Sequence, residues 1–184
     1  MNFFKITFIL SLLMISKSYT QSKATVEKSI FGVETGFLGF WINNEFKLAS
    51  SISLKSELGI DAGLFGGGTN KIGTVLVPVL TLEPRYYYNL QKRRNNNKTT
   101  RNNSANFLAL NLKFQSDISI TSNKEIDVVS NINVIPKWSL RRTIGDHFHY
   151  ETGFGIGYRY FLEKVNSNTG EIAVDLHLRV GYNF

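Results

Sequence analysis

The sequence predicts an all-β fold: an antiparallel up-and-down transmembrane β-barrel of about eight strands, seven of them clearly countable, after an N-terminal signal peptide. The segment 171–184 alternates between apolar and polar residues without an error. Side chains on a strand change face at every residue, so this strand has one apolar face and one polar, charged face. Further strands of this kind follow an export signal. Apolar-out, polar-in strands are what a membrane-spanning barrel requires.

Residues 1–20 have the parts of a signal peptide. An early cation, Lys5, precedes an apolar run at 6–15, and small polar residues lead to a cleavage site before Gln21. The apolar run is too short to span a bilayer as a helix, and no later segment has 18 consecutive apolar residues. We therefore expect a signal peptide at 1–20, a short lead at 21–28 and one barrel domain at 29–184.

Seven segments alternate like strands and are separated by turn-rich stretches. Their spans are 29–43, 51–64, 74–89, 105–121, 131–143, 147–162 and 171–184. Single-chain bacterial barrels usually have an even number of strands, so an eighth must come from residues 21–28 or from division of a long segment. Pro78, Pro84 and Pro136 fall inside strand candidates and indicate bulges or strand ends.

The alternation assigns side chains to two faces. The first segment would place Phe31, Val33, Phe37 and Trp41 on the apolar outer face, although Leu38 and Phe40 then face inward, and Trp41 and Trp138 would join an aromatic girdle. The expected inner acids are Glu34, Glu57, Asp61, Glu83, Asp117, Glu151, Glu171 and Asp175. The expected inner bases are Lys55, Arg85, Lys113, Lys137, Arg141, Arg159 and Arg179. The nearly equal numbers of inner acids and bases predict a barrel whose interior is filled by paired charges, and not an open porin.

Within that interior, one set is expected to form a lumen charge network: Glu57, Asp61, Glu151, Arg159, Asp175, His177 and Arg179. The net charge of +7 has another origin, because two of these charges leave with the signal peptide and five lie in a single acid-free loop. That loop is a candidate contact for anionic lipid or cell wall through Lys92, Arg93, Arg94, Lys98 and Arg101. We expect no nucleic-acid partner, because the chain is exported and no aromatic residue is interleaved for base stacking.

Enzymatic and metal chemistry have only weak signals. His147, His149 and Glu151 share a strand face as metal ligands would, but polar residues of the lumen give the same pattern. His177 with Asp175 and Glu171 invites a hydrolase with Ser53 or Ser139, yet no nucleophile motif is present. The glycines at 66–68 lack the Lys-Ser/Thr of a phosphate loop, and the chain has no cysteine. We expect no enzyme, no cofactor and no catalytic or metal site.

The chain resembles the small outer-membrane β-barrel proteins of Gram-negative bacteria of the Bacteroidetes type. The resemblance rests on the final strand, 175–184, with its terminal Phe184, and on the short turns in 41–48 and 142–148, each followed by a Gly-bearing strand. It covers roughly residues 29–184. It implies the fold, a location in the cell outer membrane, contact with outer-membrane lipid and recognition of the strand ending at Phe184 by the barrel-assembly machinery. It transfers no functional residue and names no specific protein partner.

With a periplasmic C-terminus, loops 66–73, 122–130 and 163–170 would lie outside, and turns 44–50, 90–104 and 144–146 would be periplasmic. The leading expectation is a barrel with a structural or surface-interaction role and no catalysis. Two alternatives stay open. One is a soluble, lipocalin-like barrel with Phe154 and Leu176 inside around an apolar ligand. The other is a barrel-embedded enzyme.

Overall fold

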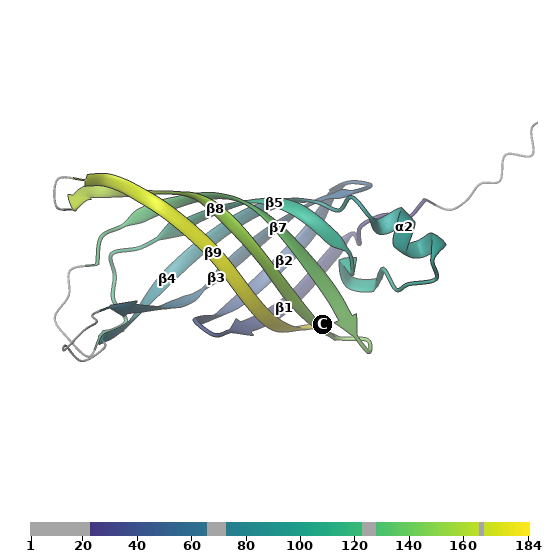
Figure 1. The fold of residues 1–184 in the computed structure, drawn as a ribbon. Helices are drawn as coiled ribbons and strands as arrows, with labels where there is room; N and C mark the ends of the chain where they lie inside the picture. The colour runs from purple at the N-terminus through teal and green to yellow at the C-terminus, as the bar shows by residue number, and fades with distance from the viewer. Residues whose placement is uncertain (1–22, 66–72, 123–127, 166–167) are drawn as a thin grey trace, which may run out of the picture.

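The computed structural model describes residues 23–65, 73–122, 128–165 and 168–184. The predicted signal peptide (1–20) and the glycine turn (66–68) lie outside the described residues. The described chain forms one antiparallel sheet that closes on itself, with a single short α-helix at one end (Figure 1). The fold class predicted by alternation, an all-β up-and-down barrel, is confirmed.

The sheet follows the order of the chain around a ring. Its strands are β1 (Ser29–Gly36), β2 (Gly39–Ala49), β3 (Ile52–Phe65), β4 (Gly73–Tyr86), β5 (Asn106–Gln115), β6 (Thr121–Ser122), β7 (Asn131–Ile144), β8 (Phe148–Val165) and β9 (Asn168–Asn183). β1 pairs with β9 and closes the ring. The two-residue β6 pairs with β4, as β5 does, so the two form one interrupted strand position. The barrel therefore has eight strand positions.

The eighth strand comes from division of the first predicted segment. β1 and β2 form a hairpin in which Gly36 pairs with Gly39, and Phe37 and Leu38 make the turn. The turn reverses the alternation, so Phe40 lies on the exterior and Trp41 points into the interior. The expectation that Trp41 belongs to an outer girdle is therefore wrong. In the sequence pattern Leu38 and Phe40 broke the alternation by facing inward, and the turn explains that break.

The first described residues, before β1, and the C-terminus lie at one end of the barrel, which we call the termini end (Figure 1). The backbone N–H of Phe184 donates to the carbonyl of Phe31 there, at 3.0 Å. The β2–β3, β4–β5 and β7–β8 connections lie at the same end, and the β1–β2 turn lies toward the opposite end. The first of these connections differs from expectation, since β2 continues to Ala49 and the chain turns at 50–51, not at 44–50.

All three prolines lie inside strands, and at two of them the pairing keeps its register on both sides. Pro84 pairs with Leu54, and Pro136 pairs with Leu110. On the other side of each strand, the β4–β5 pairing omits Pro84 and the β7–β8 pairing omits Pro136. The register is nevertheless the same before and after each gap. Pro78 pairs with Ile60 inside β4, but on the other side the pairing with β5 ends at Val79 and the pairing with β6 resumes at Leu76 in a shifted register. A proline lacks the N–H donor for a ladder bond but keeps the extended backbone, so the expectation of bulges or strand ends is wrong for Pro84 and Pro136, whereas the strand beside Pro78 is interrupted.

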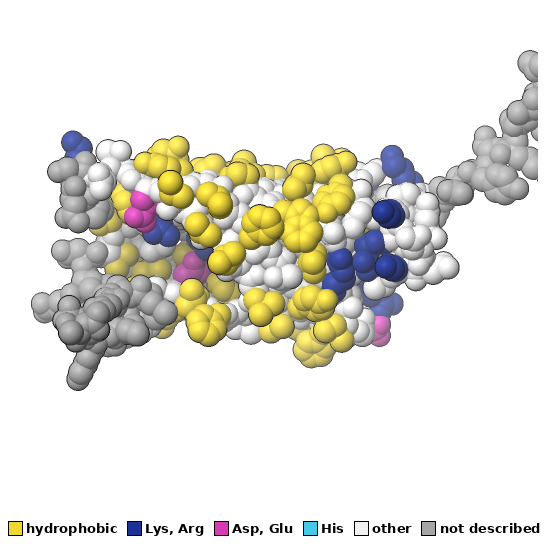
Figure 2. Space-filling model, in the orientation of Figure 1, with side chains coloured by type: hydrophobic (Ala, Val, Ile, Leu, Met, Phe, Trp, Pro, Cys, Tyr) yellow, Lys and Arg dark blue, Asp and Glu magenta, His cyan; other side chains and the backbone are white. Residues whose placement is uncertain are grey.

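Apolar side chains cover the barrel exterior, as the band in Figure 2 shows. Phe154 and Leu176, which a soluble barrel with an apolar lumen would turn inward, are 56% and 78% exposed. The lipocalin-like orientation of the faces is therefore wrong. In the described part of the chain, the outward strand positions carry charge only at Arg142 and Lys164, close to the ends of β7 and β8. No helix among the described residues has the length and apolar character to cross a membrane.

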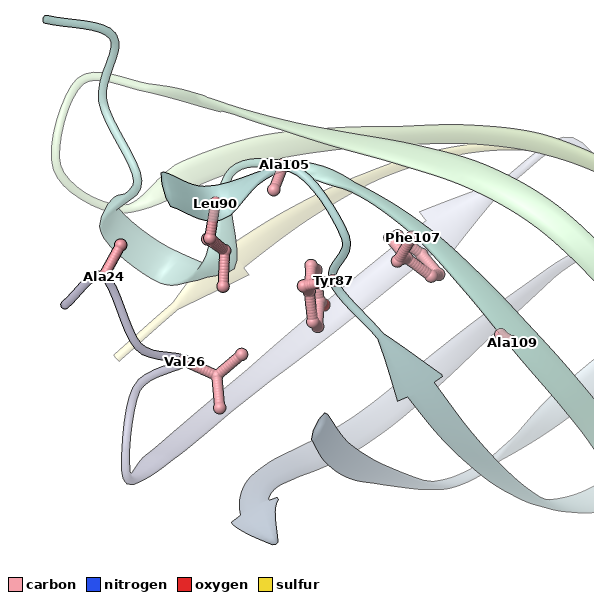
Figure 3. Close-up of a cluster of buried hydrophobic side chains, with 7 residues drawn as sticks. All are labelled: Ala24, Val26, Tyr87, Leu90, Ala105, Phe107 and Ala109. Carbon is pink, nitrogen blue, oxygen red and sulfur yellow. The ribbon is translucent and has the colours of Figure 1, made fainter. Parts of the chain in front are cut away.

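A cluster of buried apolar side chains closes the barrel at the termini end, and we call it the plug (Figure 3). It comprises Ala24, Val26, Tyr87, Leu90, Ala105, Phe107 and Ala109. The lead segment folds back over the opening: the N–H of Ala24 donates to Gln91, and that of Glu27 donates to Asn103, both at 2.8 Å. Leu90 opens the helix α2 (Leu90–Asn95), and the 3-10 helix η1 (Arg101–Asn103) follows. Both helices lie in a segment predicted to be loop.

Candidate functional site

Eleven titratable side chains are buried in the barrel interior, above the plug, and we call this group the charge network. Five are acids, five are Lys or Arg, and one is histidine: Glu34, Glu45, Glu57, Glu83, Glu151, Lys55, Arg85, Lys137, Arg141, Arg179 and His149. They project inward from β1, β2, β3, β4, β7, β8 and β9. Because the acids and bases are equal in number, the network neutralises itself when His149 is uncharged.

Glu151 lies near the centre of this network. Both of its oxygens accept from the Arg85 guanidinium, at 3.0 and 2.9 Å, in a bidentate pair. One oxygen also accepts from Arg141 at 3.0 Å. Bidentate Arg–carboxylate pairs are the strongest and most directional ion pairs in proteins. Three strands are joined through this one carboxylate.

Glu45 connects the network to the plug. Its carboxylate accepts from Arg141 at 2.8 Å, and from the Tyr87 hydroxyl at 2.8 Å. Ser53 and Asn103 donate to it as well, at 2.6 and 2.7 Å. Burial raises the pKa of the Tyr87 hydroxyl, which keeps that group a donor. Sequence analysis did not assign Glu45 to the interior, because it placed residues 44–50 in a turn.

The third part of the network lies toward the opposite end. Lys55 contacts Glu34 at 2.7 Å and Glu57 at 2.6 Å. Arg179 also contacts both carboxylates, at 3.3 and 2.8 Å, and its guanidinium lies 4.0 Å from the ring centre of Trp41. His149 is within 3.1 Å of Glu34. Each buried charge here has an opposite partner, as buried ions require.

The predicted network residues fall into two groups. Glu57, Glu151 and Arg179 lie inside the charge network, where Glu57 and Arg179 contact each other. The others lie farther from the plug and are less buried. Asp61 pairs with Lys113 at 2.7 Å, and Asp175 lies 3.6 Å from Lys137 and 3.8 Å from His177. The side chains of Arg159 and Glu171 pair with each other but are 38% and 51% exposed.

A cavity of about 540 Å³ occupies the interior at the end opposite the termini, and we call it the vestibule. Its polar wall is formed by Asp61, Lys113, Gln115, Arg159, Asp175, His177 and Arg179. Trp41 packs with Val75, Val77 and Val79 against the same space. The interior is therefore layered, from plug to charge network to vestibule, and side chains close it toward the termini end.

The residues considered for metal or hydrolase chemistry do not form a site. His149 and Glu151 are buried in the charge network, whereas His147 is exposed in the β7–β8 turn and stacks on Tyr182. Within the described residues no group of three or more such side chains is arranged to hold a metal ion. The Ser53 hydroxyl donates to Glu45, and the Ser139 hydroxyl is buried without a hydrogen-bond partner among the described residues. Neither serine is hydrogen-bonded to His177.

The loop cations predicted to contact anions are divided between two places. Arg101 pairs with Asp146 of the β7–β8 turn. Lys92, Arg93 and Lys98 instead line a pocket of about 460 Å³ between α2 and the barrel wall, together with Arg142 of β7, and we call it the cationic pocket. Arg94 lies on the same helix but is not part of the pocket lining. Figure 2 shows Lys and Arg side chains gathered at this end, beside the apolar band. Arg142 was not expected in this pocket, because the sequence placed it at the start of the short turn at 142–148.

The chain matches no protein-family model, no curated protein and no solved structure.

Proposed function

We propose that the chain is an integral β-barrel protein of the outer membrane of a Gram-negative bacterium, exported by the signal peptide at residues 1–20. Its role is structural or one of surface interaction, without catalysis. The observation that carries this proposal is the arrangement of the two faces. Charges are enclosed and paired inside, while exposed Leu, Ile, Val, Phe and Tyr side chains surround the outside.

The energetics favour lipid as the medium around this exterior. A Lys or Arg at the mid-plane of the lipid-facing surface costs about 2–4 kcal/mol, and the cost falls toward the interfaces. The two outward charges, Arg142 and Lys164, are close to strand ends, where that cost is small. In water, by contrast, an apolar surface that encircles the barrel would drive association.

The lengths of the strands that form the barrel fit the same proposal, except for β1, which has eight residues. β3, β4 and β7 each have 14 residues, and β8 and β9 have 18 and 16. A tilted strand needs about 9–11 residues to cross the hydrocarbon core. Closure of the ring joins residues 32–36 of β1 to residues 179–183 of β9 and shortens the unpaired edge, which matters because each unsatisfied backbone group in lipid is costly.

The C-terminal strand supports recognition by the barrel-assembly machinery as part of this proposal. Phe184 is exposed on the exterior, beside Phe31 and Tyr182, with ring centres 5.5 and 5.2 Å away. It ends the strand that must pair with β1 to complete the barrel. A receptor for this segment would meet an apolar face that ends in an aromatic ring.

The chain's two tryptophans provide the test of membrane insertion, because one lies inside the barrel and the other outside. Trp138 is on the outer face of β7, and Trp41 is buried in the interior. In vesicles of lipid brominated on its acyl chains, Trp41→Phe, which keeps Trp138, is expected to lose fluorescence strongly. Trp138→Phe, which keeps Trp41, is expected to be quenched much less. Heat-modifiable gel mobility confirms that each variant is folded.

The two outcomes that oppose the proposal are distinct. Recovery of the protein in the soluble periplasmic fraction, with no quenching of Trp138 by brominated lipid, would exclude membrane insertion. Equal quenching of both tryptophans in folded protein would exclude the assignment of the inner and outer faces.

A further inference from the structure

The cationic pocket concentrates positive charge that no carboxylate neutralises. Lys92, Arg93, Lys98 and Arg142 are four of its eight lining residues, and none of those eight is an acid. None of these four cations forms a salt bridge with another described residue, whereas the nearby Arg101 pairs with Asp146. Burial lowers the pKa of Arg93, as expected where no opposite charge compensates the loss of water.

Neutral acceptors hold the two arginines in place. Arg93 donates to the carbonyl of Thr99 at 3.0 and 3.2 Å. Arg142 donates to the carbonyl of Arg141 at 2.7 Å and to Asn106 at 2.6 Å. These contacts orient the guanidinium groups without cancelling their charge. A phosphate placed between them would accept charge-assisted hydrogen bonds from pre-positioned donors.

The pocket lies where the apolar wall ends. Arg142 is on the outward face of β7, four residues beyond Trp138, and pairs across the ladder with Tyr150. The indole N–H of Trp138 donates to the hydroxyl of Tyr88 at 2.8 Å, and Tyr88 lines the pocket. Leu108, paired with Trp138, continues the apolar surface. Tyr and Trp side chains favour the level of the lipid headgroups.

We propose that the cationic pocket binds the phosphate of an anionic glycerophospholipid, such as phosphatidylglycerol, in the leaflet at the termini end of the barrel. This inference rests on the proposed membrane location. The acyl chains lie along Leu108 and Trp138 while the phosphate enters among the four cations. A zwitterionic lipid is disfavoured, because its ammonium or choline group finds no carboxylate in the pocket lining.

Trp138 reports on this site directly, since Tyr88 connects it to the pocket. The full mature chain carrying Trp41→Phe is placed in phosphatidylcholine vesicles, and brominated phosphatidylglycerol or brominated phosphatidylcholine is titrated in. The ratio of the two quenching constants gives the preference for the anionic lipid, and is expected to exceed about fivefold. One cation near an anionic headgroup contributes about fivefold. Arg142→Gln and Lys92→Gln are therefore each expected to lower the ratio about fivefold, toward one.

Lys28→Gln is the matched control, because it removes one exposed charge at the same end of the barrel, before β1, and the ring order places β1 away from β5 and β7. It is expected to leave the ratio unchanged. The wild-type chain should give the same order of ratios, since its second tryptophan is inside. This comparison remains valid if Trp41→Phe reduces the folded yield.

Each other outcome decides against a particular claim. Equal quenching by both lipids would overturn the headgroup site while leaving membrane insertion intact. Absence of quenching by either lipid would overturn insertion itself. An equal fall in the ratio for Lys28→Gln would mean that surface charge alone attracts the lipid. Loss of the preference on addition of millimolar glycerol phosphate would show that the phosphate ester alone fills the pocket, which would overturn the claimed contribution of the acyl chains along Leu108 and Trp138.

Discussion

The charge network and the cationic pocket use the same kinds of side chain under opposite conditions. In the network, five Lys and Arg residues are buried among five glutamates, and every cation is within ion-pair distance of an acid. In the pocket, four cations sit at the surface with no acid in the lining. The first arrangement leaves no charge for a ligand to satisfy. The second leaves charge that only an external anion can satisfy.

Because of this difference, we expect the charge network to contribute to stability and the cationic pocket to contribute to binding. Removal of one member of a buried ion pair leaves its partner uncompensated, which typically costs about 3–5 kcal/mol. Removal of an exposed charge away from such features usually changes stability by less than about 0.5 kcal/mol. Identical substitutions in the two regions should therefore have very different effects, and lysine to glutamine offers the direct comparison.

The largest effect is expected for Lys55→Gln. Its ammonium group lies 2.7 Å from Glu34 and 2.6 Å from Glu57. Without it the two buried carboxylates share Arg179, and Glu34 keeps only a longer contact of 3.6 Å with a second arginine, Arg141. We expect the free energy of unfolding to fall by about 3–5 kcal/mol. Urea titration of the barrel in zwitterionic vesicles, followed by tryptophan fluorescence, measures the change. A loss below about 1 kcal/mol would show that the network does not hold the barrel together.

The alternation in the sequence was sufficient to predict the two faces of β8 and β9. A strand with one apolar and one charged face turns the apolar face outward in lipid and inward in water. The alternation could not specify the partners of the inner charges. Glu45 and Arg141 are 96 positions apart, and their contact follows from ring closure. The division between β1 and β2 was not expected, because the two central residues of the turn, Phe37 and Leu38, are apolar, although glycines flank them.

The plug and the cationic pocket were also beyond sequence analysis, for a different reason. α2 has only six residues, too few for intrinsic propensity to stabilise it, and its buried residue Leu90 holds it against the plug. The lead segment looked short and polar, yet Ala24 and Val26 alternate and fold back on that helix. Arg142 joins the loop cations only because β7 ends beside α2. Such sites depend on contacts between distant segments.

A smaller effect is expected at the boundary between the network and the plug, for Tyr87→Phe. The variant loses the hydrogen bond from the hydroxyl to Glu45, but Ser53 and Asn103 still donate to that carboxylate. We expect a loss of about 1.5 kcal/mol at neutral pH, near the lower end for a hydrogen bond to a charged group. Urea titration of wild type and variant in the same vesicles measures it.

The same variant tests the pH dependence. Burial raises the pKa of Tyr87 above the value of about 10 that the hydroxyl has in the unfolded chain. A raised pKa contributes stability that is complete below pH 10 and is lost as the pH rises above it, by up to about 1.4 kcal/mol per pH unit. The wild-type chain should therefore lose its advantage over Tyr87→Phe between about pH 10 and 12. A constant difference across that range would contradict a buried, protonated Tyr87.

The smallest effect on stability is expected for Lys92→Gln, the counterpart of Lys55→Gln in the cationic pocket. Lys92 is exposed on α2 and forms no salt bridge with another described residue, so in zwitterionic vesicles the free energy of unfolding should change by less than about 0.5 kcal/mol. In vesicles that contain phosphatidylglycerol, the free energy of unfolding should increase more for the wild-type chain than for the variant, because a ligand stabilises the state that binds it. Urea titrations in the two kinds of vesicle measure both quantities. An equal increase in the free energy of unfolding for wild type and variant would mean that Lys92 does not contribute to lipid binding. A large decrease for the variant in zwitterionic vesicles would mean that the cationic pocket, like the charge network, stabilises the fold.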